Sequence, residues 1–288
     1  MSLLSSLVPR SIRRRIILSK IKVDEAALAH VCVKVADTEA ETIGAARIVH
    51  DSYVKRGILS PHDTGLHLSR FSASPTTWTF VAKLGERVIG TMSLIAEGTG
   101  PEDGTRLPME SIYGPELRPF RAAGEFLAEV GALAIAPEYR GSGLVLWLNR
   151  IMVKTAVALG VDRLVIAVHP DAGDIYREAL LFSEIGPERA YPGLNKSARA
   201  LALSLDMRDI TGQFERAFAA LGPSACNMLQ VYSARIPQIQ EPQDLERTDR
   251  RGARRALRRA RPDVIPARIS LATYPTAFRP SEHARVSP

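Results

Sequence analysis

The feature that most constrains the fold is one continuous segment in which a strand passes through a glycine turn into a long helix. It reads EVGALAIAPEYRGSGLVLWLNRIMVKTAVALG and spans residues 129–160. An apolar strand ends at Ala136, and a turn follows with glycines at 141 and 143. Apolar side chains then recur at helical spacing until Gly160. Such a unit predicts a strand and a helix that packs back onto the same sheet.

The rest of the chain predicts an alternation of helices and strands around this unit. The expected elements are a helix at 37–53, strands at 78–83, 87–95 and 125–136, a helix at 143–159, a strand at 162–168, a short helix at 174–182, a strand at 198–205 and a helix at 210–222. This order predicts an α/β fold with a mixed central sheet flanked by helices, in which a βαβ unit joins neighbouring parallel strands.

The same patterns divide the chain into four regions. We expect a basic N-terminal extension at 1–35, a main domain at 36–207, a helical extension at 208–240 and an Arg/Pro-rich tail without fixed structure at 241–288.

Charge is unevenly distributed and limits the class of partner. The net charge is +7, and basic residues gather between Arg10 and Lys22 and in the run RRGARRALRRARP at 250–262. Such runs are either solvated tails or docking surfaces for an acidic protein or an anionic membrane. Aromatic residues are not interleaved with them and no nucleic-acid-binding motif accompanies them, so a specific nucleic-acid function is not expected.

Other composition features favour the cytoplasm. No run of about 18 apolar residues occurs, and the start lacks the pattern of a secretory signal. The two cysteines, Cys32 and Cys226, lie far apart and without metal-ligand spacing. These features predict a cytoplasmic protein and leave a peripheral contact with the inner membrane open.

The glycine turn before the helix has two interpretations. Glycines there leave backbone N–H groups bare at the positive end of the helix, which favours an anion such as a phosphate, and Arg140 adds a cation. Alternatively, the turn only connects a strand to a helix. The spacing matches neither a dinucleotide-binding fingerprint nor a P-loop.

The turn also resembles a known family motif. Residues 140–145, RGSGLV, resemble the R-x-x-G-x-G/A phosphate-binding loop of the GNAT superfamily of acyl-CoA N-acyltransferases, with Val145 where a small residue is commoner. Further resemblance, over about residues 40–207, is to the long-chain N-acyl amino acid synthases, relatives of the acyl-homoserine-lactone synthases. It is carried by Y-x-x-R-G at 53–57, the strands TFVAK and VIGTMSLI, Glu129, IYREALLF at 175–182 and GPERAYPGL at 186–194.

Two departures from the family pattern bear on specificity. Leu181 replaces the glycine that usually precedes the phenylalanine of the short helix. Asp171 and Ala172 follow Pro170, where a histidine is often found.

The resemblance implies a GNAT-like fold and an acyl donor carried on phosphopantetheine. Such a donor would be a substrate, from acyl carrier protein or CoA, and no tightly bound cofactor is expected. The residues that the resemblance assigns to the donor arm are Leu133, Ile135, Arg140, Gly141, Ser142, Gly143 and Leu144. The acceptor would be the α-amine of an amino acid.

Acyl transfer from a thioester to an amine needs a base, donors for the oxyanion and a proton for the departing sulfur. Glu129 is the candidate base, mainly because the superfamily often has an acid at this position, and its apolar neighbours would raise its pKa; Glu125 is a near competitor. Tyr176 is the candidate proton donor, since the superfamily often has a tyrosine there. Arg56 can grip the acceptor carboxylate and Tyr53 would line the same wall.

Each of these residues also has a plain structural interpretation, as a packed tyrosine, a surface arginine or an ion-paired carboxylate. The histidines lack metal-ligand spacing, so no metal site is expected.

Three functions remain open. The leading hypothesis is an N-acyltransferase that moves a medium or long acyl chain from acyl carrier protein, or CoA, to an amino acid. An acyl-homoserine-lactone synthase is a sibling hypothesis. The third is a GNAT-like module that no longer catalyses but binds an acyl carrier or a membrane. Oligomeric state is not predicted.

Overall fold

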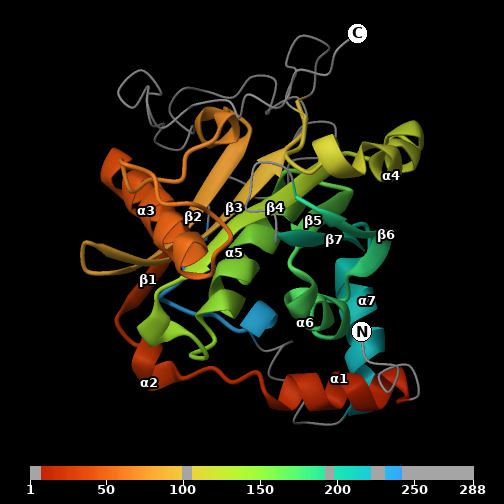
Figure 1. The fold of residues 1–288 in the computed structure, drawn as a ribbon. Coiled ribbons are helices and arrows are strands. Elements are labelled where there is room, and N and C mark those ends of the chain that lie inside the picture. Colours follow the sequence, from red (N-terminus) through yellow and green to blue (C-terminus); the bar gives the residue numbers. More distant parts are fainter. Residues whose placement is uncertain (1–7, 99–105, 192–197, 222–230, 242–288) are drawn as a thin grey trace, which may run out of the picture.

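The computed structural model describes residues 8–98, 106–191, 198–221 and 231–241. Its centre is a sheet of seven strands in the order β1-β2-β3-β4-β5-β7-β6, flanked by helices (Figure 1). The strands are β1 (Val31–Val35), β2 (Thr77–Leu84), β3 (Arg87–Ala96), β4 (Leu127–Ile135), β5 (Arg163–Val168), β6 (Ser183–Ala190) and β7 (Arg199–Asp206). The α/β prediction with a mixed central sheet is therefore confirmed.

Helices cover both faces of the sheet (Figure 1). They are α1 (Arg10–Ser19), α2 (Glu25–Leu28), α3 (Glu39–Lys55), α4 (Glu110–Ala122), α5 (Leu144–Ala158), α6 (Gly173–Glu178) and α7 (Ile210–Phe218), with short 3-10 turns that include η2 (Arg70–Ala73) and η3 (Pro137–Tyr139). No helix among the described residues is long and apolar enough to cross a membrane.

Alternation along the strands decides which helix lies on which face. Phe80 and Leu94 pack in the main core with α5, α6 and α7. Val81 packs with Ala45 of α3, and Ile95 packs with residues of α4. Because successive side chains of a strand point to opposite faces, α3 and α4 share the face opposite α5.

The first turn of α3 fastens it to the edge of the sheet. The Thr38 side chain caps the helix by accepting a hydrogen bond from the Glu41 N–H, 3.2 Å away. The Glu41 carboxylate is buried and binds Lys83 of β2 at 2.8 Å and Lys34 of β1 at 3.1 Å. This cluster sets the position of the helix that carries Tyr53 and Arg56.

β4 and β5, the parallel pair of the sheet, are paired only at their first residues. β4 pairs with β5 at Leu127–Arg163, Ala128–Leu164 and Glu129–Val165, while β5 goes on to pair with β7 as far as Val168. β4 itself continues to Ile135 against β3. The two strands therefore diverge just after Glu129, and a gap opens at the centre of the sheet.

Five described elements differ from the expectation. α1 and α2 lie within the expected N-terminal extension, where no helix was predicted. β1 lies within the expected N-terminal extension and pairs antiparallel with β2, so the sheet begins before residue 36. α4 and β6 fall where no element was predicted. Most of the expected tail, residues 242–288, lies outside the described residues.

Candidate active site

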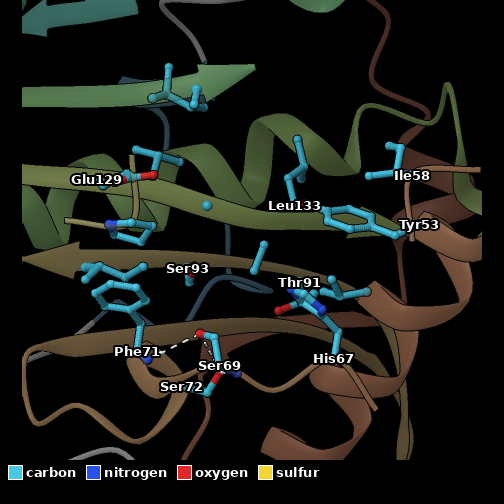
Figure 2. Close-up of a pocket in the computed structure, with 18 of the residues that line it drawn as sticks. Tyr53, Ile58, His67, Ser69, Phe71, Ser72, Thr91, Ser93, Glu129 and Leu133 are labelled. Atoms are coloured by element: carbon cyan, nitrogen blue, oxygen red, sulfur yellow. Dashed lines mark hydrogen bonds between the residues drawn. The ribbon is translucent and has the colours of Figure 1, made fainter. Parts of the chain in front are cut away.

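A cavity of about 610 Å³ lies where β4 and β5 diverge (Figure 2). Its walls come from α3, the segment around η2, strands β2 to β5, and α6. The β2–β3 wall is rich in hydroxyl groups, from Thr77, Thr79, Thr91 and Ser93. The β4–β5 wall is mainly apolar, from Val130, Leu133, Ile166 and Val168. The cavity can therefore take a molecule with one apolar and one polar part.

The β4 wall is distorted by a bulge. Thr91 of β3 pairs with Ala134 and Ser93 pairs with Gly131, so β4 has one extra residue between those pairs. Ala132 at the bulge has φ 48°, a left-handed conformation that is uncommon for a residue with a Cβ. No β5 residue pairs with this part of β4 in the described structure. Main-chain groups of β4 therefore face the gap and can serve a ligand.

Glu129 lies at the point where the two strands separate. Its side chain is 4% exposed and lines the cavity, and its Oε2 accepts a hydrogen bond from the Met109 N–H at 2.8 Å. Burial raises the pKa of the carboxyl to about 8, with the hydrogen bond from Met109 opposing the shift. A carboxyl with a pKa near neutrality, beside a cavity, is suited to accepting a proton from an amine.

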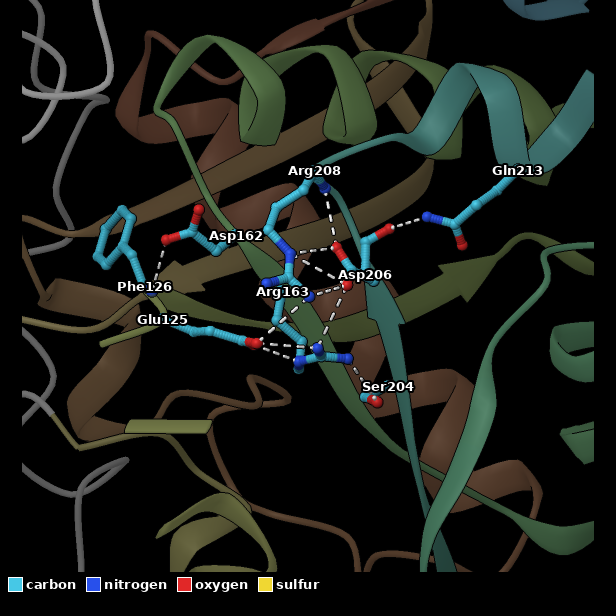
Figure 3. A network of polar contacts seen from close by, with 8 residues as sticks. All are labelled: Glu125, Phe126, Asp162, Arg163, Ser204, Asp206, Arg208 and Gln213. Atoms are coloured by element: carbon cyan, nitrogen blue, oxygen red, sulfur yellow. Dashed lines mark hydrogen bonds and ion pairs between the residues drawn. The ribbon is translucent and has the colours of Figure 1, made fainter. Parts of the chain in front are cut away.

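Glu125, the competing candidate, does not line the cavity. Its carboxylate binds Arg163 at 2.5 Å, and Arg163 and Arg208 in turn bind Asp206 (Figure 3). The network fixes the start of β4 to β5 and to the end of β7. Geometry therefore distinguishes the two acids: Glu125 belongs to this network and Glu129 to the cavity.

Tyr176 reaches the cavity from α6 and is 7% exposed. Its ring meets the ring of Phe182 edge-on, with centroids 5.5 Å apart. Burial, and secondarily the neighbouring Tyr53, raise the pKa of the Tyr176 hydroxyl above its usual value, so it stays protonated at neutral pH. A protonated hydroxyl in this place can donate to a leaving group.

Tyr53 and Arg56 both line the cavity near the end of α3. The Tyr53 ring lies 5.6 Å from the ring of His67, and burial raises the pKa of its hydroxyl (Figure 2). Arg56 is the exposed C-cap residue of α3. No ion pair of Arg56 occurs within the described residues, so its charge is available to a ligand at that end of the cavity.

The glycine loop adopts the conformation that its sequence predicts but does not line the cavity. Gly141 and Gly143 have φ 83° and 86°, the left-handed region that favours glycine. A Cβ on Gly143 would lie 2.6 Å from the Lys22 carbonyl oxygen, because the segment before α2 packs against the loop. Ser142 Oγ accepts a hydrogen bond from the Leu144 N–H at 3.3 Å, which partly satisfies the start of α5.

The predicted site residues thus fall into two groups. The cavity brings together Glu129, Tyr176, Tyr53, Arg56 and Leu133. The others lie outside the cavity: Ile135 is the last residue of β4, and the loop Arg140–Gly141–Ser142–Gly143–Leu144 follows that strand. Arg140 connects the groups, since its Nη2 donates to Ser52 Oγ of α3 at 3.4 Å and its Nε donates to the Ile135 carbonyl at 3.3 Å.

Several cavity residues were not predicted. They include His67, Thr77, Ser93 and Tyr191. The Thr77 hydroxyl is buried without a hydrogen-bond partner among the described residues, which marks a place for a polar ligand atom. Burial, and secondarily the Glu129 charge, raise the pKa of Tyr191. The sequence did contain a signal for the hydroxyl wall. Thr77 and Thr79 alternate along one strand and Thr91 and Ser93 along the next, so these hydroxyl side chains share one face of the sheet.

This mixed sheet, with its gap between β4 and β5, has a GNAT-type fold. The structure of BjaI, a CoA-dependent acyl-homoserine lactone synthase, aligns with a TM-score of 0.53 over 79% of this chain and 99% of that one, at 15% identity. At that identity the likeness concerns the fold.

The chain belongs to the family of the N-acyl amino acid synthase FeeM, whose sequence model matches residues 44–204, more than half of the chain. The structure of FeeM itself, from uncultured soil microbes, aligns with a TM-score of 0.55 and 28% identity over 64% of this chain and 94% of that one. No curated protein sequence matches significantly. The resemblance to N-acyl amino acid synthases, and with it an acyltransferase, is confirmed.

Proposed function

We propose that the protein transfers a medium or long acyl chain from the phosphopantetheine thioester of acyl carrier protein to the α-amine of an amino acid. The observation that carries this proposal is Glu129, a buried carboxyl with a pKa of about 8, at the point where β4 and β5 separate. Membership of the FeeM family supports an amino-acid acceptor.

The two kinds of cavity wall match the two halves of an N-acyl amino acid. The apolar wall of β4 and β5, with Val49 and Leu68 on the α3 side, suits an acyl chain. The hydroxyl wall of β2 and β3, with the unpartnered Thr77 hydroxyl, suits the polar acceptor. Arg56 can bind the acceptor carboxylate at the end of α3 by a two-point contact.

The chemistry then follows from the position of each group. Glu129 takes a proton from the ammonium of the acceptor and passes it to solvent, and the free amine attacks the thioester carbon. The nitrogen, which is cationic in the tetrahedral intermediate, then gives its second proton to Glu129. The oxyanion receives hydrogen bonds from β4 main-chain N–H groups that face the gap. As the carbon–sulfur bond breaks, Tyr176 gives its proton to the departing thiolate and is later reprotonated from solvent.

Exposed cations at the end of α3 support a protein-borne donor. Arg140 reaches Ser52, which lies one helical turn before Arg56, and Lys55 is adjacent. Acyl carrier protein is acidic, so a cluster of positive charge beside the cavity would steer it to the site. CoA uses the same phosphopantetheine arm and is the alternative donor. We further propose a cytoplasmic location, with the basic run at 250–262 giving a peripheral contact with anionic membrane.

Matched donors test the proposal. Purified protein is given the same acyl group on acyl carrier protein or on CoA with a panel of amino acids, and products and free thiol are measured by mass spectrometry and a thiol reagent. We expect N-acyl amino acids, with a higher kcat/KM for the carrier-protein donor. Absence of products and of thiol release with both donors would refute the enzyme, leaving the non-catalytic binding module. Release of a lactone from adenosylmethionine would favour the sibling synthase.

Lys55→Glu tests the docking surface. We expect a higher KM for the carrier-protein donor at low salt and an unchanged KM for the CoA donor. Because screening weakens exposed charges, the difference should shrink at high salt. A KM that is unchanged for both donors at low salt would argue against docking at this surface.

A further inference from the structure

The basic start of the chain is folded against the catalytic domain. α1 packs against α6 at the opposite end of the molecule from α4 (Figure 1), and its Arg14 contacts α7. It precedes the segment that matches the FeeM family, which begins at residue 44. Neither the family nor the proposed chemistry therefore explains why this helix carries so many arginines.

Three of those arginines converge on one buried carboxylate. Glu178 at the end of α6 is 5% exposed, and its oxygens lie 3.5 Å from Arg13, 3.6 Å from Arg10 and 4.0 Å from Arg14. A carboxylate that is this deeply buried needs opposite charge close by. These arginines therefore belong to the fold and do not form a solvated tail.

Arg14 also binds main chain on two elements at once. Its Nε donates to the Glu178 carbonyl oxygen of α6, and its Nη1 donates to the Ala217 carbonyl oxygen of α7, both at 3.0 Å. Its guanidinium lies 5.6 Å from the centre of the Phe218 ring. Burial, reinforced by the charge of Arg10 and opposed by Glu178, lowers the pKa of Arg14. A planar guanidinium can hold two carbonyls in this way, whereas an ammonium cannot hold both in the same geometry.

The helix held in this way is the one that carries Tyr176. α6 has only six residues, too few to be stable without tertiary contacts. Tyr176 lies two residues before Glu178. The carbonyl oxygen of Tyr176 accepts a hydrogen bond from the Phe182 N–H at 2.9 Å. The position of the Tyr176 hydroxyl in the cavity therefore depends on what fixes the end of α6.

We infer that α1 is a brace for the acyl-transfer site, with Arg14 and Glu178 as positioning residues for Tyr176. The inference rests on the proposed function of Tyr176 as proton donor. A displaced hydroxyl would lower the rate of thioester cleavage, while the acceptor and donor contacts on α3 and β4 stay in place. The effect should therefore fall on kcat and leave KM nearly unchanged.

A double-mutant cycle tests the brace. Arg14→Lys keeps the charge and loses the two-carbonyl contact, and we expect kcat to fall about tenfold with little change in KM. In a Tyr176→Phe background the same substitution should change kcat less than about twofold, because the group that it positions is gone. Arg216→Lys is the matched control on α7, where an exposed arginine binds Asp209.

Three results would overturn the brace. The first is an unchanged kcat for Arg14→Lys. The second is an equal loss in both backgrounds, which indicates a general structural role. The third is a kcat for Tyr176→Phe equal to that of the native enzyme. Tyr176 would then not be the proton donor and would need no positioning, while the proposed acyl transfer to amino acids would be unaffected.

A second readout needs no turnover, so it separates failure of the brace from failure of the proposed function. In protein labelled with 3-fluorotyrosine, the ¹⁹F resonance of Tyr176 is identified by its loss in Tyr176→Phe. We expect it to shift in Arg14→Lys and in Glu178→Gln, and to stay in place in Arg216→Lys and in Glu215→Gln, an exposed α7 control. A resonance unmoved by both test substitutions would overturn the brace even if acyl transfer is confirmed.

Discussion

Replacing Glu129 with glutamine removes the ionisable group at the centre of the cavity with little change of shape. The carboxyl is 4% exposed and accepts a hydrogen bond from the Met109 N–H. The amide oxygen of glutamine can accept the same hydrogen bond. The substitution should therefore leave the fold intact and act on protonation alone.

Stability gives the first measurable consequence. Burial raises the pKa of Glu129 from its ordinary 4.5 to about 8. A raised pKa means that the folded protein favours the neutral acid. Below about pH 4.5 the carboxyl therefore does not lower the free energy of unfolding, and it lowers it increasingly as the pH rises to about 8. The difference of about 3.5 pKa units, at about 1.36 kcal/mol each, gives an upper value of about 5 kcal/mol. Glu129→Gln should therefore be more stable than the native chain at pH 9, and equally stable near pH 4.5.

Activity gives the second consequence. In the native enzyme kcat should rise with pH through an apparent pKa of about 8, as Glu129 loses its proton. Glu129→Gln should lose this ascending limb and about 100-fold or more in kcat, because a positioned base contributes about 10²–10⁴-fold. The ionisation of the acceptor amine is common to both proteins and cancels in the ratio of their rates.

Urea unfolding at pH 4.5, 7 and 9 measures the stability difference between the native chain and Glu129→Gln. Initial rates from pH 5 to 10 measure how kcat of each protein rises with pH. Glu86→Gln, on the exposed hairpin, is the matched control and should alter neither. A native-to-variant ratio of kcat that does not rise through about pH 8, or native stability that does not fall relative to the variant between pH 4.5 and 9, would refute the assignment of a buried base.

Three further predictions concern the surroundings of the site. Tyr176→Phe should lower kcat about 100-fold at constant KM, measured as thiol release, and an unchanged kcat would argue against the proton donor. Gly143→Ala should lower the free energy of unfolding by at least about 1–2 kcal/mol, because φ is 86° and the new Cβ would meet the Lys22 carbonyl at 2.6 Å; an unchanged urea midpoint would contradict this. Glu41 has its pKa lowered to about 2, although its burial acts in the opposite direction, because Lys83 and other donors bind its carboxylate. Glu41→Gln should therefore cost about 3 kcal/mol at pH 7, a loss that fades as the pH falls from about 4.5 through 2, as acid titration of both proteins in urea would show.

The periodic parts of the fold could be predicted from the sequence, and the interrupted parts could not. The long helix α5 and the hairpin of β2 and β3 carry clear periodicity. α4 contains Pro115 and Pro119 and a non-helical Tyr113, so its pattern suggests a loop, and packing stabilises it as a kinked helix. β6 contains Pro187, which a strand tolerates at the edge of a sheet, where β6 lies.

The site shows the same division between local and tertiary information. Glu129 could be assigned mainly from the family resemblance, with its apolar neighbours as support, and burial does raise its pKa. The cavity walls depend on β2, β3 and α3 meeting in space, so His67 gave no local signal of a shared site, and the alternation that includes Thr77 did not show what that face meets. Leu181 occupies a position where the family usually has glycine, and its φ is 61°. In this left-handed conformation a side chain is energetically unfavourable, which explains the family's preference for glycine.

The divergence of β4 and β5 has a consequence for how the donor is recognised. A phosphopantetheine arm in the gap would replace the missing neighbouring strand and pair with peptide groups of β4 beyond Glu129. Peptide groups are the same in every residue except proline, so this pairing would not depend on the side chains of that stretch, whereas Val130 and Leu133 would still contact the acyl chain. A single proline between Val130 and Ile135 would therefore weaken donor binding whichever side chain it replaced.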